Sequence, residues 1–138
     1  MSLRWDVPSD KLDPQFCEDI DGLLGASAFH WVVTIGYRTF AEQKALYEKH
    51  LAGGPLAAPP GESAHNWGLA VDCAFIKDGQ ALSWDTSGAE FPWLWAAVLA
   101  HPRLHSGHSF QDDDHIEAYP AWNLKKAELK ASGQWGKE

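Results

Sequence analysis

The chain of 138 residues carries 11 Lys and Arg against 19 Asp and Glu, a formal net charge of −8, with 45% hydrophobic residues and eight tryptophans. This composition is typical of a folded globular protein and argues against a disordered or fibrous one. We expect one catalytic domain over residues 1–138 and a monomer. A nucleic-acid partner is not expected because no basic run is present, and no apolar run approaches the roughly 20 residues of a membrane span.

The first predicted elements are a helix, a strand and a second helix. A proline at the first helical position and apolar residues at helical spacing predict a helix over 13–25. β-branched and aromatic residues predict a strand within 30–38. Thr39 and Glu42 form a capping-box pattern at the start of a helix over 40–52, which two glycines end.

A loop and a strand follow. Residues 53–64 hold three glycines and three prolines, which predicts an irregular loop over the site. Residues 69–76 are predicted to form a strand that ends in a turn at 77–80.

The last third of the chain is predicted to contain two helices and two short strands. Ser87 and Glu90 form a second capping-box pattern before a helix over 91–101. Two strands are expected within 104–119 and a helix over 122–131. The apolar side of that helix is predicted to consist of Leu124, Ala127 and Leu129. Few short strands with separate helices indicate an α+β fold with an antiparallel sheet.

The stretch SAHNWGLAVD, residues 63–72, carries a metal-ligand type near each end, His65 and Asp72. If the chain between them were extended, their Cα atoms would lie about 23 Å apart, too far for both side chains to reach one ion. Asn66 and Gly68 tolerate the backbone conformations of a tight turn. A turn here would allow the two side chains to meet.

A catalytic zinc site usually has three protein ligands and one open position, so a third ligand is needed downstream. The segment QDDDHIEAYP supplies His115, with Asp112, Asp113, Asp114 and Glu117 around it. Zinc on such a set lowers the pKa of water toward about 7, and a nearby carboxylate can take the proton as the water attacks a carbonyl. The pattern therefore predicts a zinc-dependent hydrolase.

Residues 63–72 resemble the S-x-H-x-x-G-x-A-x-D signature of the zinc D,D-carboxypeptidases, D-Ala-D-Ala dipeptidases and phage L-alanyl-D-glutamate endopeptidases, which cut peptidoglycan peptides. GYRTFAEQKALY and DDDHIE resemble the upstream and downstream blocks of that family, and the three blocks span about 36–117 in the family's order. The resemblance implies a hedgehog/D,D-peptidase-like α+β fold, with helices packed on a small antiparallel sheet and a single zinc site in a cleft.

The resemblance also implies a role for individual residues. It implies one Zn²⁺ per chain on His65, Asp72 and His115, with Asp112 as general base, Arg38 binding a substrate carboxylate or steadying the oxyanion, and Ser63 contacting substrate. Asp114 and Ile116 stand where family members commonly have a proline and an aromatic residue.

Strand alternation offers a second interpretation of the acidic segment. If the segment were extended, Asp113 and Glu117 would share the face of His115, and Asp113 would be the base. We predict Asp112, because a base must reach the attacking water from a bend beside the ligand strand, and we predict that Glu117 orients His115. The other histidines are expected not to be ligands: His30, His50, His101, His105 and His108.

The predicted function is hydrolysis of peptidoglycan stem peptides by a phage or prophage endolysin of the L-alanyl-D-glutamate endopeptidase kind. The N-terminal sequence lacks a recognisable signal peptide, so we expect synthesis in the cytoplasm and holin-type release to the wall. The alternatives are a D-Ala-D-Ala carboxypeptidase or dipeptidase, and a zinc-bearing wall-binding or virion module whose catalysis has lapsed.

Overall fold

The computed structural model describes residues 3–135. In chain order its helices, 3₁₀ turns and strands are β1 (Leu3–Trp5), α1 (Pro14–Gly25), β2 (Trp31–Ile35), α2 (Phe40–Leu51), η1 (Ala64–Trp67), β3 (Ala70–Lys77), β4 (Ala81–Ser83), α3 (Glu90–Leu99), β5 (Leu104–Ser106), η2 (Gly107–Phe110), β6 (His115–Ala118) and α4 (Ala121–Ala131). None of the helices within this range is long and apolar enough to cross a bilayer.

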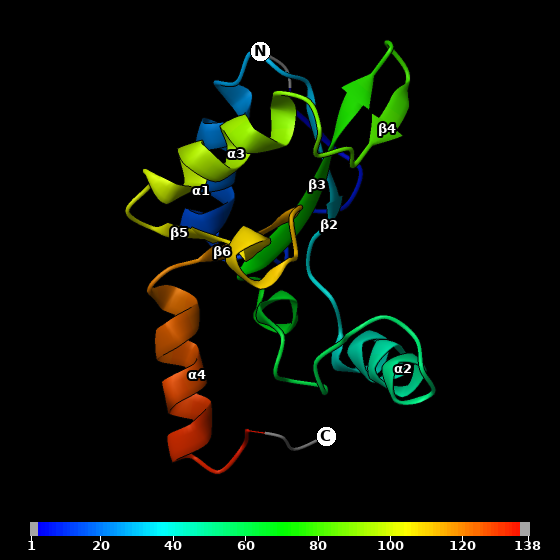
Figure 1. The fold of residues 1–138 in the computed structure, drawn as a ribbon. Helices are drawn as coiled ribbons and strands as arrows, with labels where there is room; N and C mark the ends of the chain where they lie inside the picture. The colour runs from blue at the N-terminus through cyan, green and yellow to red at the C-terminus, as the bar shows by residue number, and fades with distance from the viewer. Residues whose placement is uncertain (1–2, 136–138) are drawn as a thin grey trace.

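The strands form one sheet in the order β1-β2-β3-β6-β5, with β4 paired to β3. All neighbouring pairs are antiparallel except β1 and β2. Figure 1 shows α1 and α3 together on one side of the sheet, and α2 and α4 extending below it with the η1 turn between them. This is the predicted α+β class.

The hydrophobic core lies between the sheet and the helices α1 and α3. Its helical members are spaced three or four residues apart, so that one face of each helix is buried. These are Phe16, Ile20 and Leu24 of α1, and Phe91, Leu94 and Val98 of α3. Trp31 of β2 is fully buried among them and donates its indole N–H to Ser27 Oγ at 3.0 Å. Each such side chain contributes about 1.5–3 kcal/mol by its burial.

Local sequence signals account for the first two helices. The side chain of Asp13 accepts a hydrogen bond from the backbone N–H of Phe16 and caps α1, with a proline at the next position. Thr39 and Glu42 make both hydrogen bonds of the predicted capping box at the start of α2. The predicted helices over 13–25 and 40–52 are confirmed. Their start could be read from the sequence because each cap is made by residues within three positions of the helix.

Two predictions about elements are wrong in detail. The strand β1 was not predicted, and its parallel pairing with β2 departs from a purely antiparallel sheet. The helix α3 begins at Glu90 after Ala89 without a side-chain cap. Ser87 instead hydrogen-bonds to Asp85 through both its N–H and its hydroxyl, so the predicted capping box is absent.

The buried side of α4 also differs from the prediction. Leu124 is 66% exposed, whereas Trp122 and Leu129 are buried. The ammonium of Lys125 lies 4.2 Å from the centroid of the Trp67 ring. The buried side of α4 therefore includes a lysine that lies over an aromatic ring. The aliphatic stem of a lysine can cover apolar surface, and a pattern of apolar residues alone does not reveal this.

Candidate metal site and its cleft

Three side chains from three elements converge below the sheet: His65 from η1, Asp72 from β3 and His115 from β6. One donor atom of each lies within 4.8 Å of the others. Asp72 Oδ1 lies 3.3 Å from Nε2 of His65 and 3.1 Å from Nδ1 of His115. The three predicted zinc ligands are therefore brought together.

The predicted turn between His65 and Asp72 is made by η1. The side chain of Ser63 accepts a hydrogen bond from the backbone N–H of His65, and Gly68 ends the turn with φ of 68°. A Cβ at Gly68 would collide with the carbonyl oxygen of Lys11, so the position requires glycine for both reasons. Gly68 thus turns the chain as predicted.

Asn66 has a different part in the turn from the one predicted. It lies within η1 and is buried, and its side chain links the site to its surroundings. Its Nδ2 donates to the backbone carbonyl of Arg38 at 3.0 Å, and its Oδ1 accepts from the N–H of Gly61 at 3.0 Å. The backbone N–H of Arg38 also donates to the carbonyl of His65 at 3.0 Å.

The third member joins the cluster through strand pairing. In the antiparallel register of β3 and β6, Asp72 lies directly opposite His115, and Ala70 lies opposite Glu117. Directly opposed residues point to the same face of a sheet, with Cβ atoms about 5 Å apart. The register therefore brings together two residues that are far apart in the sequence.

Both histidines have a partner on the ring nitrogen that faces away from Asp72. Nδ1 of His65 lies 2.9 Å from the carbonyl oxygen of Gly36, and Nε2 of His115 lies 2.9 Å from Oε1 of Glu117. A carbonyl or carboxylate oxygen only accepts, so these nitrogens carry the hydrogens. The other nitrogen of each ring, Nε2 of His65 and Nδ1 of His115, faces Asp72 and could ligate a metal ion once it carries no hydrogen.

The electrostatic environment of the cluster favours a positive charge. Burial alone would raise the pKa of Asp72, but hydrogen bonds from His115 and His65 outweigh it and hold that pKa well below its usual range. Burial would lower the pKa of His115, but the hydrogen bonds that its ring donates to Asp72 and Glu117, together with their negative charges, raise that pKa to about 10. Two buried carboxylates thus favour positive charge between them.

The donor set fits zinc. Two imidazole nitrogens and one carboxylate oxygen are the ligand types of catalytic zinc sites, which keep another position open. The hydrogen bonds that His65 donates to the carbonyl of Gly36 and His115 donates to Glu117 are of the kind that orient histidine ligands of metals. His65, Asp72 and His115 could therefore hold such an ion.

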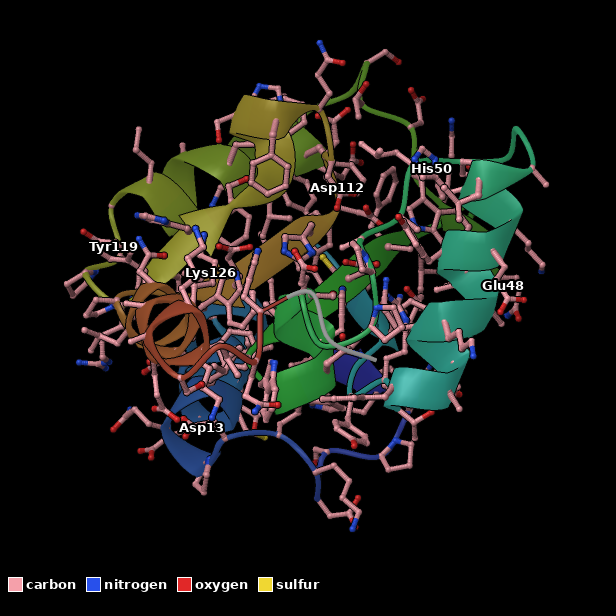
Figure 2. The ribbon with its side chains drawn as sticks, turned by 90° about the horizontal axis from the view of Figure 1, so that it is seen from below. Asp13, Glu48, His50, Asp112, Tyr119 and Lys126 are labelled. Carbon is pink, nitrogen blue, oxygen red and sulfur yellow. The ribbon has the colours of Figure 1, made fainter. Side chains whose placement is uncertain are left out.

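The cluster lies in a cleft of about 730 Å³ between α2, the 55–64 segment and the η2 turn. Its lining includes the predicted substrate-binding residues Arg38 and Ser63, the predicted base Asp112, and Glu117. Figure 2, which looks from below, shows Asp112 above the centre of the view, to the left of α2. The loop over 53–64 contributes one wall, as predicted.

The acidic segment before His115 is a turn and not an extended strand. β6 begins at His115, and the N–H of His115 donates to the carbonyl of Asp112 across the turn at 3.2 Å. Asp112 Oδ2 lies 3.7 Å from Nδ1 of His115, while Asp113 Oδ1 lies 2.8 Å from Nδ1 of His108, outside the cleft. The alternation that favoured Asp113 is therefore absent from the structure.

Asp114 occupies a more enclosed position than its neighbours. Burial, and then the negative charges of Asp72 and Asp112, raise the pKa of its carboxyl group to about 7. A neutral Asp114 would keep a further negative charge away from the cluster.

Gln43 is a cleft residue that the sequence did not single out. It is buried, its Oε1 accepts from Nη1 of Arg38 at 2.9 Å, and its Nε2 donates to the carbonyl of Ala58 at 2.8 Å. The side-chain amide of Gln43 thus hydrogen-bonds both to the guanidinium of Arg38 and to the loop at Ala58. The only feature of the sequence that could have pointed to Gln43 is its position in the predicted helix, five residues after Arg38.

Gly107 is a second residue that the sequence did not single out. A Cβ at this position would collide with the carbonyl oxygen of Asp112 and lie 2.8 Å from Cβ of His115. Its lack of a side chain allows η2 to pack against the turn that carries Asp112.

The remaining histidines do not join the donor cluster found among residues 3–135. His105 and His108 lie on the far side of η2, in a second cavity. His101 accepts a hydrogen bond at Nδ1 from the backbone N–H of Arg103 at 3.0 Å.

Comparisons with known proteins show the family of this chain. Residues 11–102 match the family VanY, D-alanyl-D-alanine carboxypeptidase. The chain is 40% identical over 129 residues to the peptidoglycan L-alanyl-D-glutamate endopeptidase CwlK of Bacillus subtilis, covering 83% of this chain and 77% of the relative.

Two solved structures share the fold. The L-Ala D-Glu endopeptidase ChiX of Serratia marcescens superposes with a TM-score of 0.61 at 17% identity, covering 80% of this chain and 82% of the other. A mutant of the vancomycin resistance D,D-pentapeptidase VanY, in complex with Zn(II), gives a TM-score of 0.52 at 20% identity, covering 88% and 79%. Because the family match spans more than half of the sequence, the chain belongs to the VanY D-alanyl-D-alanine carboxypeptidase family.

Proposed function

We propose that this protein is a zinc-dependent peptidase that hydrolyses peptidoglycan stem peptides, of the L-alanyl-D-glutamate endopeptidase kind. The observation that carries the proposal is the convergence of His65, Asp72 and His115 in a cleft that also holds Asp112 and Arg38. Zinc, when bound to these ligands, would supply Lewis acidity to the scissile carbonyl and to the attacking water.

The residues of the cleft divide the remaining work. Asp112, with a side chain 49% exposed, can meet water at the mouth of the site and take its proton. The same carboxyl group can return that proton to the leaving amine. Glu117 holds the ring of His115 through a 2.9 Å hydrogen bond and so orients a ligand without reaching substrate.

Arg38 supplies a site for a carboxylate. Its Nη1 is engaged by Gln43, while its side chain lines the cleft. In a stem peptide the D-Glu residue is linked onward through its side-chain carboxyl, which leaves its α-carboxylate free beside the scissile nitrogen. A guanidinium can grip such a carboxylate through two parallel hydrogen bonds. Ser63, at the cleft wall, is proposed to contact the same substrate.

The L-Ala–D-Glu bond is proposed as the one cleaved because of a curated relative that aligns with most of this chain. The relative that is 40% identical over 83% of this chain is named as an L-alanyl-D-glutamate endopeptidase, which supports cleavage of the internal bond. The family description favours the second candidate, a D-Ala-D-Ala carboxypeptidase or dipeptidase, whose substrate also presents a carboxylate to Arg38.

Digestion of purified muropeptides tests the proposal directly. We expect zinc-loaded protein to release fragments with a new N-terminal D-Glu, identified by mass spectrometry, and chelation to abolish the release until zinc is added back. Release of a terminal D-Ala would identify the second candidate. Zinc binding without any cleavage would identify a module whose catalysis has lapsed, although Asp112 still offers a base.

The cellular setting remains a prediction. If the protein is a phage endolysin, its production in a bacterial cytoplasm should lyse the cells only when a holin is produced with it. Lysis without a holin would contradict release through membrane lesions.

A further inference from the structure

A second cavity of about 760 Å³ lies beside the catalytic cleft, at the free edge of β5. Its walls come from α3, β5, η2 and the segment after β6. Phe110 at the end of η2 lines both cavities, and its ring centroid lies 5.9 Å from that of His115. We call this second cavity the β5 groove. A single aromatic side chain therefore separates it from the metal cluster.

The chemistry of the β5 groove differs from that of the cleft. Its lining contains no Asp, Glu, Lys or Arg among the described residues, whereas the cleft is lined by Arg38, Lys49, Asp72 and Asp112 among others. Large apolar side chains are exposed in it: Leu99 is 88%, Phe110 56% and Tyr119 37% exposed. A stem peptide with free carboxylates suits the cleft, and an uncharged ligand with apolar faces suits the groove.

Flat rings are fixed in place along the groove. The His105 and Tyr119 rings stack with centroids 3.7 Å apart, and those of Trp95 and His108 with centroids 3.6 Å apart. His108 is also held by Asp113, and the indole N–H of Trp95 donates to the carbonyl of Asp113 at 2.8 Å. Ordered rings with polar nitrogens match a pyranose, which has apolar C–H faces and hydroxyl or acetamido groups at its edge.

The covalent structure of peptidoglycan places a sugar near this position. The L-Ala of a stem peptide is attached through its amine to the lactyl group of muramic acid. The sugar ring then lies about two residue lengths, or about 7 Å, from the L-Ala carbonyl. A D-Ala-D-Ala bond lies several residues farther from the sugar. The sugar of a ligand cut at L-Ala in the cleft is therefore within reach of Phe110, whose ring centroid lies 5.9 Å from that of His115.

We propose that the β5 groove binds the N-acetylated glycan strand that carries the stem peptide, on the Leu99, His105, Phe110 and Tyr119 surface. This inference rests on the proposed L-alanyl-D-glutamate endopeptidase function. In Figure 2 Tyr119, at the groove, lies at the left edge of the molecule, and Asp112, at the cleft, lies to its right above the centre of the view. The protein would then recognise glycan and peptide in adjoining sites.

The first test compares two substrates that share the same peptide. One carries the GlcNAc–MurNAc disaccharide on L-Ala, and the other carries an acetyl group there. We expect wild-type kcat/KM to be higher on the sugar-bearing substrate, and the Leu99→Ser/His105→Ala variant to reduce that preference about tenfold, since each aromatic or apolar contact is worth about threefold to tenfold. Leu124→Ser, at an exposed leucine of α4 that lines neither cavity, should keep the wild-type preference.

The second test does not depend on cleavage. GlcNAc–MurNAc with its lactyl carboxyl group capped as an amide is titrated into isotope-labelled, zinc-loaded protein. Chemical-shift changes at Tyr119 and Phe110, lost in the double variant and kept in Leu124→Ser, would support the groove even if the bond cut were not L-Ala–D-Glu. Equal efficiency on the two substrates, with no shifts in the groove, would overturn the inference, as would stronger shifts there from the sugar-free peptide.

Discussion

The inner and outer parts of the cleft are built differently. The ligand cluster is buried, with His65 4% and His115 7% exposed, and each of its histidines is held from behind by a second hydrogen bond. The rim residues Asp112 and Arg38 come from a turn and a segment between elements, and both face the cleft. The difference suggests that metal binding depends on the sheet and substrate turnover on the loops. The two parts should then be separable by substitution.

Loss of a ligand should have the largest effect, because a three-ligand site rarely survives on two. We expect His65→Ala, Asp72→Ala and His115→Ala each to reduce zinc from about one ion per chain to a small fraction, and activity to background. Zinc content by mass spectrometry after dialysis and the muropeptide assay would measure this. A wild-type protein that retains no zinc at neutral pH would refute the metal site itself.

Loss of the base should remove activity without removing the ion. We expect Asp112→Asn to lower kcat by about 10²- to 10⁴-fold, the usual contribution of general-base catalysis, with normal zinc content and folding. Asp113→Asn is the matched control, because its carboxylate contacts His108 outside the cleft. A dead Asp113→Asn variant beside an active Asp112→Asn variant would reverse the assignment.

Arg38 tests the geometry of the rim. We expect Arg38→Ala to lower kcat/KM by about 10- to 100-fold, the value of hydrogen bonds to a charged group. Arg38→Lys should lose nearly as much, because lysine keeps the charge but not the fork. Zinc content should stay normal in both. Wild-type kinetics for Arg38→Ala would make this residue a structural partner of Gln43 and nothing more.

Substitution of Glu117 should affect zinc binding more than turnover, the opposite of the effect expected for Arg38. We expect Glu117→Ala to weaken zinc affinity by about 10- to 100-fold, measured by competition with a chelator, because His115 loses the group that orients its ring. At saturating zinc most of the activity should return. Glu117→Gln retains an acceptor oxygen and should weaken the affinity less. An unaltered zinc affinity in Glu117→Ala would show that the strand register alone orients His115.

A pair remote from the cleft should affect stability and not catalysis. Arg103 donates two hydrogen bonds, of 2.8 and 2.7 Å, to the carboxylate of the buried Asp19 on α1, which lowers the pKa of Asp19. Because that pKa is lower in the folded state, the pair stabilises the fold above about pH 4 and loses its effect as the pH falls through the folded value. We expect Arg103→Ala to lower the free energy of unfolding at pH 7, because the buried carboxylate of Asp19 loses its guanidinium partner.

Denaturant unfolding at several pH values would measure the Arg103→Ala effect. The difference from wild type should shrink at acidic pH, while zinc content and kcat/KM at 25 °C stay unchanged. A difference that does not vary with pH would mean that Arg103 acts through packing alone.

The sequence by itself determined the features that depend on neighbours along the chain. Caps at Asp13 and Thr39 begin α1 and α2, and Gly68 turns the chain so that His65 can approach Asp72. These succeed because the interacting groups lie within a few residues of each other, so residue type and spacing contain the whole geometry. The need for a third ligand then indicated His115 in the downstream acidic segment, and the family resemblance implied the same residue.

Tertiary structure decided what depends on contacts between distant segments. The β3–β6 register sets His115 against Asp72, and a turn, not a strand, presents Asp112 to the cleft. Lys125 of α4 lies over the ring of Trp67, and Gln43 meets Ala58, only in the folded chain. The physical reason is that such contacts follow from packing and strand pairing, whose partners no local pattern specifies.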